Sequence, residues 1–291
     1  MSLINVRGRL GRSTVTVCVY HPPKKGPAIM RKSRKFWCAL GTVAAVATTI
    51  ALSVTDASAT TVPANTGSIP LSATKVVSGT FDGGMKRYYG TGDLGSGGQA
   101  EGEDPLFDLP NGGTLKNVIL GSPASDGVHC EATCTLQNVW WEDVGEDAAT
   151  FKPKSSGATM TILGGGALHA ADKVIQHNGT TGGTVVIDGF QVEDFGKLYR
   201  SCGNCKSGQS KRTVIIRNVT ATYKGGALAG INTNYGDTAT FSNITILKDS
   251  SKKIVICQKY IGNSTGAEPP KNGSGADGTY CKYSSSDIHY Q

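Results

Sequence analysis

Short runs of apolar and β-branched residues, each broken by a turn residue, recur along the chain from residue 115 onward. Equivalent positions in successive runs lie roughly 21 to 29 residues apart, and long helical patterns are scarce after residue 60. A repeat of this length with strand character predicts stacked β coils, in which the inward apolar residues of one coil pack on those of the next. The runs are Leu115–Leu120, Leu136–Trp141, Thr159–Leu163, Val185–Phe190, Val214–Val219 and Thr240–Thr245.

The residues at the breaks help to choose between repeat folds. An Asn or Gly breaks each run or directly follows it, and both residue types tolerate the left-handed backbone that a turn between strands requires. A leucine-rich repeat would need a helical segment in each unit, and a β-sandwich would show two-residue hairpins at closer spacing. We therefore predict an all-β fold, a single-stranded right-handed parallel β-helix. Its long surface groove would suit an extended polymer, although a fold alone does not define a function.

The formal charge of +7 suggests an anionic partner, but its distribution argues against nucleic acid. Nine of the 29 Lys and Arg residues and one of the 22 Asp and Glu residues lie in 1–59. That leaves 20 basic and 21 acidic residues in 60–291, a net charge of −1. We expect no general binding to phosphate backbones.

A secretion signal explains the basic N-terminal region. Met30 precedes a cluster of Arg and Lys, an uncharged apolar run follows over 36–54, and small residues stand at 57–59. A membrane span of similar length is the alternative interpretation. We predict a signal peptide at 30–59 because the small residues follow the apolar run so closely.

The chain is accordingly predicted to have three parts. Residues 1–29 are expected to be an over-extended N-terminus, with translation starting at Met30. Residues 30–59 form the signal peptide, and 60–291 form one β-helical catalytic domain. The mature protein is expected to be secreted to the extracellular space as a monomer, with no membrane attachment after signal cleavage.

Six Cys residues lie in the predicted mature part, and an even count in an exported chain suggests disulfides. A zinc site is the alternative, which export and the lack of a nearby His pair disfavour. Sequence alone leaves several pairings open. Pairing of near neighbours would give Cys130–Cys134, Cys202–Cys205 and Cys257–Cys281.

Carboxylates recur one coil apart near the middle of the chain. An offset of 20 or 21 residues would place Asp126 over Glu146 or Asp147. Such oxygen ligands suit Ca²⁺, and a bound cation would relieve the mutual repulsion that raises their pKa values. A solvated acidic turn is the alternative that the spacing leaves open.

Basic residues recur downstream at similar spacing. Lys152, Lys173 and Lys197 are separated by 21 and 24 residues, which predicts a cationic ladder beside the carboxylates. Arg200 adds a planar guanidinium suited to a carboxylate. Three such residues at coil spacing favour a site for an anionic ligand over unrelated surface charges.

Together these segments resemble family 3 of the polysaccharide lyases, which are pectate lyases. The resemblance extends from about Val76 to Ile246, and its specificity comes from several ordered motifs at matching separations. The motifs are Q-A-E at 99–101, A-S-D-G-V-H-C at 124–130, W-E-D-V-G-E-D-A-A-T-F-K at 141–152, D-K-V-I-Q at 172–176 and D-F-G-K-L-Y-R at 194–200.

The resemblance implies a parallel β-helix that cleaves de-esterified polygalacturonate (pectate) by calcium-dependent β-elimination, giving unsaturated oligogalacturonides. It implies that Asp126, Glu146 and Asp147 bind Ca²⁺. The residues that it assigns to the substrate site are Lys173, Lys197, Arg200 and Glu101. We add Lys152 and Asp172 to this site as substrate-binding residues, because they lie within these motifs.

The predicted reaction removes the proton on C5 of a uronate, and cations can stabilise the negative charge that develops. Lys is a weak base at its ordinary pKa of about 10.4, so neighbouring cations, Ca²⁺ and partial burial would have to lower that pKa. Lys173 is the preferred base, with Lys197 assisting and Arg200 binding the substrate carboxylate. Arg200 as the base is the alternative, although its pKa makes this harder.

Two other functions would suit the same fold. A pectin-hydrolysing enzyme needs one carboxylic acid as proton donor and a second carboxylate, and carboxylates are present. A polygalacturonate-binding module would use aromatic platforms. Aromatic residues are only 7% of the chain, and Trp140 and Trp141 lie on a predicted strand. The cationic residues favour elimination over both.

Overall fold

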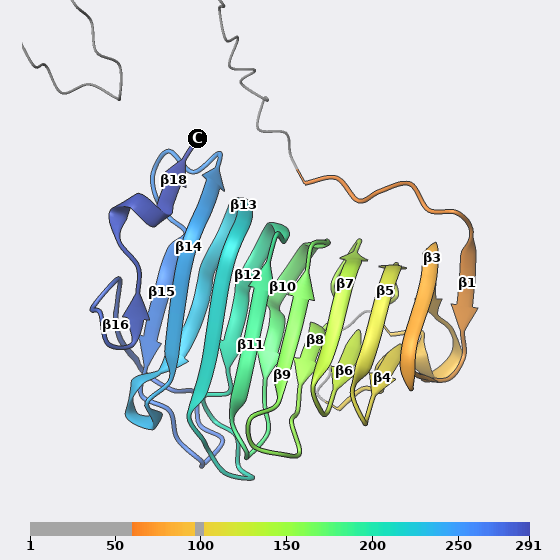
Figure 1. The fold of residues 1–291 in the computed structure, drawn as a ribbon, viewed down its shortest axis with the longest axis horizontal. Helices are drawn as coiled ribbons and strands as arrows, with labels where there is room; N and C mark the ends of the chain where they lie inside the picture. Colours follow the sequence, from red (N-terminus) through yellow and green to blue (C-terminus); the bar gives the residue numbers. More distant parts are fainter. Residues whose placement is uncertain (1–59, 97–101) are drawn as a thin grey trace, which may run out of the picture. The chain divides into compact units, whose positions relative to one another are not determined.

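The computed structural model describes residues 60–96 and 102–291. The predicted leader, the signal peptide and Glu101 lie outside the described residues. Within the described ranges the regular structure consists of β-strands and three short 3-10 turns, and no helix there is long and apolar enough to cross a membrane. Figure 1 shows the strands side by side along the stack of coils.

The elements follow one another in a regular order along the chain. The strands are β1 (Ser68–Leu71), β2 (Lys75–Val76), β3 (Gly79–Gly90), β4 (Phe107–Leu109), β5 (Gly113–Leu120), β6 (Val128–Cys130), β7 (Cys134–Trp141), β8 (Asp147–Phe151), β9 (Thr159–Leu163), β10 (Gly166–His177), β11 (Gly183–Asp188), β12 (Gln191–Ser201), β13 (Arg212–Asn232), β14 (Thr238–Leu247), β15 (Val255–Tyr260), β16 (Lys271–Ser274), β17 (Cys281–Lys282) and β18 (Ile288–Tyr290). The 3-10 turns are η1 (Gly92–Leu94), η2 (Thr233–Tyr235) and η3 (Ser285–Asp287).

Each coil crosses three parallel sheets. The first sheet joins β2, β4, β6, β8, the later parts of β10, β12 and β13, and β15. The second joins the early parts of β3, β5, β7, β13 and β14 with β9, β11 and β17. The third joins β1, the remaining parts of these long strands and β18.

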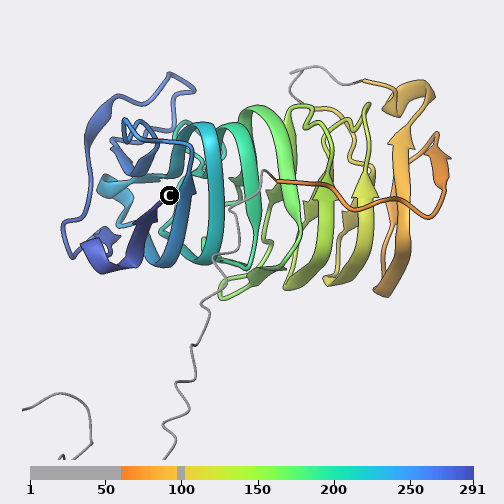
Figure 2. The same ribbon diagram turned by 90° about the horizontal axis from the view of Figure 1, so that it is seen from above.

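Long strands bend from one sheet into the next, as the view in Figure 2 shows. β13, for example, pairs in all three sheets through its successive parts. The predicted all-β, right-handed parallel β-helix is therefore confirmed. Among the named strand pairs only β15 and β16 run antiparallel.

Inward apolar side chains stack in rows from coil to coil, as the repeat predicted. Each member of one row in the second sheet is the register partner of the next, and all are at most 2% exposed. Burial of each methylene contributes about 0.8 kcal/mol, so such rows hold successive coils together. The row is Leu115, Leu136, Ile162, Ile187, Ile216 and Phe241.

Asn residues form the turn between the second and third sheets. Asn117, Asn138, Asn218 and Asn243 all have φ between 52° and 54°, in the left-handed region. Asn138 Nδ2 donates to Asn117 Oδ1 at 2.9 Å, and Asn243 Nδ2 donates to Asn218 Oδ1 at 2.8 Å. The predicted left-handed turn is confirmed, and side-chain amides link it between coils.

The three near-neighbour disulfides are also confirmed. They are Cys130–Cys134, Cys202–Cys205 and Cys257–Cys281. The alternative zinc site is wrong, because these sulfur atoms are consumed in disulfides. The third bridge joins β15 to β17 across the last part of the chain.

Replacing Val185 with Ala should lower the free energy of unfolding by about 2 kcal/mol, because this fully buried β11 side chain would leave a cavity. Val186→Ala is the matched control, since Val186 lies on the opposite, partly exposed face of β11 and should cost only about 0.5 kcal/mol. Urea denaturation measures both. Equal losses would contradict the inward assignment of Val185.

Candidate functional site

The predicted site residues gather where the chain passes from the third sheet into the first. Asp126 lies in the turn before β6, and Glu146 immediately precedes β8. Asp147 begins β8, and its Cα partner across the sheet is Lys173 of β10, whose next partner is Lys197 of β12. Parallel register therefore places carboxylate and ammonium groups from successive coils in one row.

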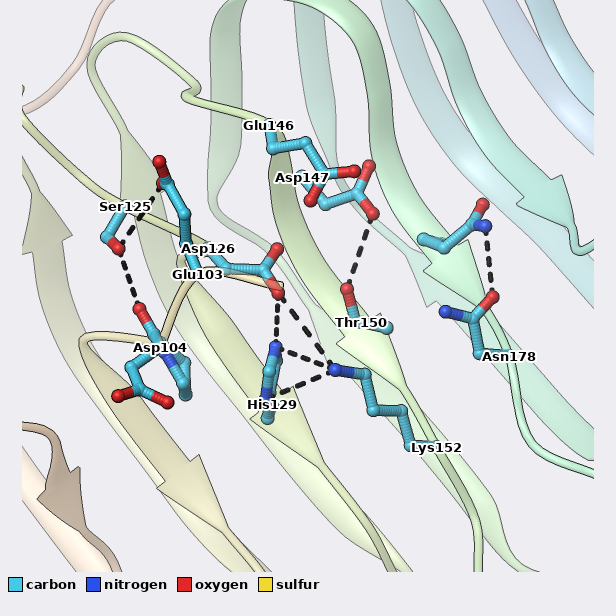
Figure 3. Close-up of polar contacts among 12 residues, drawn as sticks. Glu103, Asp104, Ser125, Asp126, His129, Glu146, Asp147, Thr150, Lys152 and Asn178 are labelled. Atoms are coloured by element: carbon cyan, nitrogen blue, oxygen red, sulfur yellow. Dashed lines mark hydrogen bonds and ion pairs between the residues drawn. The ribbon is translucent and has the colours of Figure 1, made fainter. Parts of the chain in front are cut away.

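Three buried carboxylates converge in this corner. Asp126, Glu146 and Asp147 are 4%, 6% and 3% exposed, and one oxygen of each lies within 4.8 Å of the others. Figure 3 shows these carboxylates close together. The predicted placement of Asp126 over Glu146 and Asp147 is thus confirmed, and the alternative of a solvated acidic turn is wrong because the group is buried.

The electrostatics of the group suit a divalent cation. Burial raises the pKa of Asp147 to about 7; the charges of Asp126 and Asp172 add to this effect, and Lys173 opposes it. Asp126 Oδ1 is buried without a hydrogen-bond partner, and Asp147 Oδ1 also lacks a hydrogen bond, although Lys173 Nζ lies 3.5 Å away. These clustered oxygens match the hard ligands that Ca²⁺ takes.

Lys173 lies between the acidic group, which consists of Asp126, Glu146 and Asp147, and the second cation of the site, Lys197. Its Nζ lies 2.7 Å from Asp172 Oδ2, 3.5 Å from Asp147 Oδ1 and 3.8 Å from Glu146 Oε1. Burial alone would lower the pKa of Lys173, but the carboxylates of Asp147, Asp172 and Glu146 outweigh burial and raise it above its usual range. The expected lowering of the Lys173 pKa is therefore not found, because three carboxylates surround the amine.

Asp172 holds both lysines of this row. Its Oδ1 accepts from Lys197 Nζ at 3.0 Å, while its Oδ2 accepts from Lys173 Nζ. Burial alone would raise the pKa of Asp172, but these hydrogen bonds and charges hold it below its usual range. Asp172 is thus a shared anionic partner that fixes the separation of two cationic groups.

Lys152 does not belong to the row, and the predicted three-lysine ladder is wrong on this point. The register partner of Lys173 in the preceding coil is Asp147, whereas Lys152 immediately follows β8. Lys152 Nζ instead lies 4.0 Å from Asp126 Oδ2 and 3.1 Å from His129 Nε2. A similar offset in sequence misplaced Lys152, because the coils differ in length.

Arg200 occupies a separate position farther along β12. Its side chain is largely buried, Nη1 donates to Asn232 Oδ1 at 3.1 Å, and its guanidinium carbon lies 4.0 Å from the centre of the Tyr260 ring. Burial lowers the pKa of Arg200, yet a guanidinium remains charged at neutral pH. These contacts hold the charged guanidinium of Arg200 in one orientation.

The specific partners of several site residues were not predicted from sequence. His129 and Thr150 contact the carboxylates of Asp126 and Asp147 (Figure 3). Asn232 and Tyr260 fix Arg200 from one and two coils away. His129 lies within the D-G-V-H motif and offered a signal, whereas the partners of Arg200 are too distant in sequence to be recognised.

Comparison with known sequences identifies the family to which the chain is similar. A family model described as pectate lyase matches residues 59–266. Pectate lyase E of Emericella nidulans is 51% identical over 226 residues, covering 77% of this chain and 84% of that protein. The probable pectate lyase E of Neosartorya fischeri is 53% identical over 225 residues, covering 76% and 84%.

Solved structures give the same result. The catalytic domain of pectate lyase PelI from Erwinia chrysanthemi aligns with a TM-score of 0.62 at 33% identity, covering 78% of this chain and 98% of that one. PelI in complex with tetragalacturonic acid aligns with a TM-score of 0.63 at 35% identity, covering 76% and 70%.

Proposed function

This chain belongs to the pectate lyase family, and from that premise we propose that it is a secreted, calcium-dependent enzyme that cleaves de-esterified polygalacturonate by β-elimination. Its products would be unsaturated oligogalacturonides. The complex of PelI with tetragalacturonic acid supports an oligogalacturonate ligand for the family. Three disulfides are consistent with export through an oxidising compartment, and we propose a monomer.

The observation that carries this proposal is the contact between the buried carboxylates and Lys173. Asp126, Glu146 and Asp147 would hold Ca²⁺, and Lys173 Nζ lies within 4 Å of two of these residues. A uronate carboxylate bound at this corner would bring its adjacent C5–H next to an amine. Such placement of substrate, cation and base is the main requirement of proton abstraction α to a carboxylate.

The proposed roles follow from charge and position. When bound, Ca²⁺ would neutralise the carboxylates that hold the proton on Lys173 and stabilise the negative charge that develops on the uronate. Lys173 would remove the C5 proton. Lys197, fixed by Asp172, would add positive charge beside the reacting carboxylate, and Arg200 would bind a substrate carboxylate through its guanidinium.

The remaining substrate contacts are proposals from position and resemblance. Lys152 is partly exposed beside Asp126 and would bind an outlying uronate carboxylate, while Asp172 would act through the two lysines that it holds. Glu101 keeps its predicted substrate-binding role from the Q-A-E motif. Arg200 remains the alternative base.

An ultraviolet assay on polygalacturonate tests the proposal. We expect product absorbance to rise with time in calcium at alkaline pH, because elimination leaves a C4–C5 double bond conjugated to the carboxylate. A chelator should remove the activity, and added Ca²⁺ should restore it. New reducing ends without ultraviolet absorbance would indicate a hydrolase instead.

Polymer binding without any product would indicate a binding module. Trp140 and Trp141 are only 6% and 0% exposed, so neither provides the aromatic platform that such a module would use. This burial favours the enzyme over the binding module.

A further inference from the structure

Two side chains beside the acidic group hold one oxygen of each Asp carboxylate. His129 Nε2 lies 2.5 Å from Asp126 Oδ2, and Thr150 Oγ1 donates to Asp147 Oδ2 at 3.4 Å. His129 and Thr150 are register partners in β6 and β8, so the two contacts repeat one coil apart (Figure 3).

Each contact uses one oxygen of its carboxylate and leaves the other oxygen for a cation. In both residues this other oxygen, Oδ1, is buried without a hydrogen bond, and Lys173 Nζ lies 3.5 Å from that of Asp147. A hydrogen bond to one oxygen restricts rotation of the carboxylate, and therefore directs the other oxygen. Asp126 and Asp147 are in this way oriented before any cation binds.

The hydrogen-bond pattern also assigns a tautomer to His129. A carboxylate only accepts, so Nε2 carries the hydrogen that points to Asp126, and Nδ1 is the acceptor. Lys152 Nζ lies 3.1 Å from Nε2 and 3.4 Å from Nδ1, and of these two nitrogens only Nδ1 can accept a hydrogen bond from it. Asp126 and Lys152 therefore both contact the ring of His129, and the disulfide of Cys130 fixes the adjacent backbone.

We propose that His129 and Thr150 are positioning residues, which orient Asp126 and Asp147 for calcium binding without touching the substrate. The inference rests on the proposed calcium site and adds two residues to it. Partners that orient metal ligands typically change metal affinity by about 10- to 100-fold when they are removed. His129, with the shorter contact and the second partner, has the larger effect.

Isothermal titration of the purified chain with CaCl₂ at pH 8 tests this role. We expect His129→Ala to weaken calcium binding by about 10- to 100-fold. His129→Gln should recover most of the affinity, because its amide N–H can still donate to Asp126. Thr150→Val keeps the side-chain shape and should weaken binding by about 10-fold, the lower end of this range, because its contact is longer, at 3.4 Å. At saturating calcium, kcat should stay near the wild-type value in all three.

His169→Ala is the matched control. His169 Nδ1 lies 2.9 Å from Asp194 Oδ2 in another His–Asp pair, but this pair is exposed and outside the acidic group. The calcium affinity of His169→Ala should equal that of the wild type. Thr150→Val also provides a decisive measurement if His129→Ala does not fold.

The outcomes distinguish the proposed calcium site from the proposed positioning role of His129 and Thr150. Wild-type protein that releases no heat with CaCl₂ would overturn the calcium site itself. If the wild type binds but His129→Ala and Thr150→Val bind within twofold of it, only the positioning role is wrong. An equal loss in His129→Gln and His129→Ala would also overturn it, because hydrogen-bond donation would then not matter.

Discussion

Lys173→Arg should reduce kcat on polygalacturonate by about 10²- to 10⁴-fold, the usual contribution of a general base, while the polymer still binds. Arg keeps the positive charge among Asp147, Glu146 and Asp172, so the buried carboxylates stay paired. Arg holds its proton more tightly than Lys does, because its pKa is higher. The change therefore separates base catalysis from charge stabilisation. Ultraviolet kinetics and pull-down on insoluble pectate measure the two properties.

Lys173→Ala should lose the same activity and also some stability, because it leaves buried carboxylates without their cation. Lys116→Ala is a suitable control, since Lys116 makes a partly exposed ion pair with Asp82 in the second sheet. It should retain wild-type kcat. Near-normal turnover by Lys173→Arg would exclude Lys173 as the base and transfer that role to Arg200.

Asp147→Asn should nearly abolish calcium-dependent activity and yet stabilise the metal-free chain at pH 8. In the metal-free fold the pKa of Asp147 is about 7, compared with an ordinary value of 3.8. A raised pKa means that the folded state prefers the protonated form, so stability is lost as pH rises through 7. Asn cannot ionise, and about 1.4 kcal/mol per pKa unit gives a gain of up to about 4 kcal/mol.

Thermal unfolding with chelator, at pH 6 and pH 8, measures this effect. The advantage of Asp147→Asn should be larger at pH 8, and excess calcium should cancel it by stabilising only the wild type. Calcium affinity of the wild type should also fall as pH drops below about 7, because protons compete for Asp147. A variant that is less stable than the wild type at pH 8 in chelator would contradict the assigned cost of this carboxylate.

Sequence predicted the architecture because its signals repeat. The six apolar runs form strands at the expected places, and the Asn residues within four of them adopt the left-handed turn. Offsets between motifs also predicted the contact of Asp126 with Glu146 and Asp147. These features depend on the local coil length, which can be counted along the chain.

Other features depend on register and burial, which cannot be counted in this way. Lys152 follows the strand that carries Asp147 and misses the Lys173 row, since the coils are unequal in length. The raised pKa of Lys173 reflects three carboxylates that the fold brings within 4 Å of its amine. Tyr260 reaches Arg200 only because two further coils complete the wall around it.

Because the coils are stacked, different parts of the site would be lost at different stages of unfolding. Coils contact mainly their neighbours, so such a stack can fray from an end. The carboxylates lie on central coils, whereas Tyr260, which stacks on Arg200, lies on β15 near the C-terminal end. Fraying from that end would release the guanidinium of Arg200 first and leave the acidic group intact. Mild heating would then lower the affinity for the polymer before it lowered the affinity for the calcium ion.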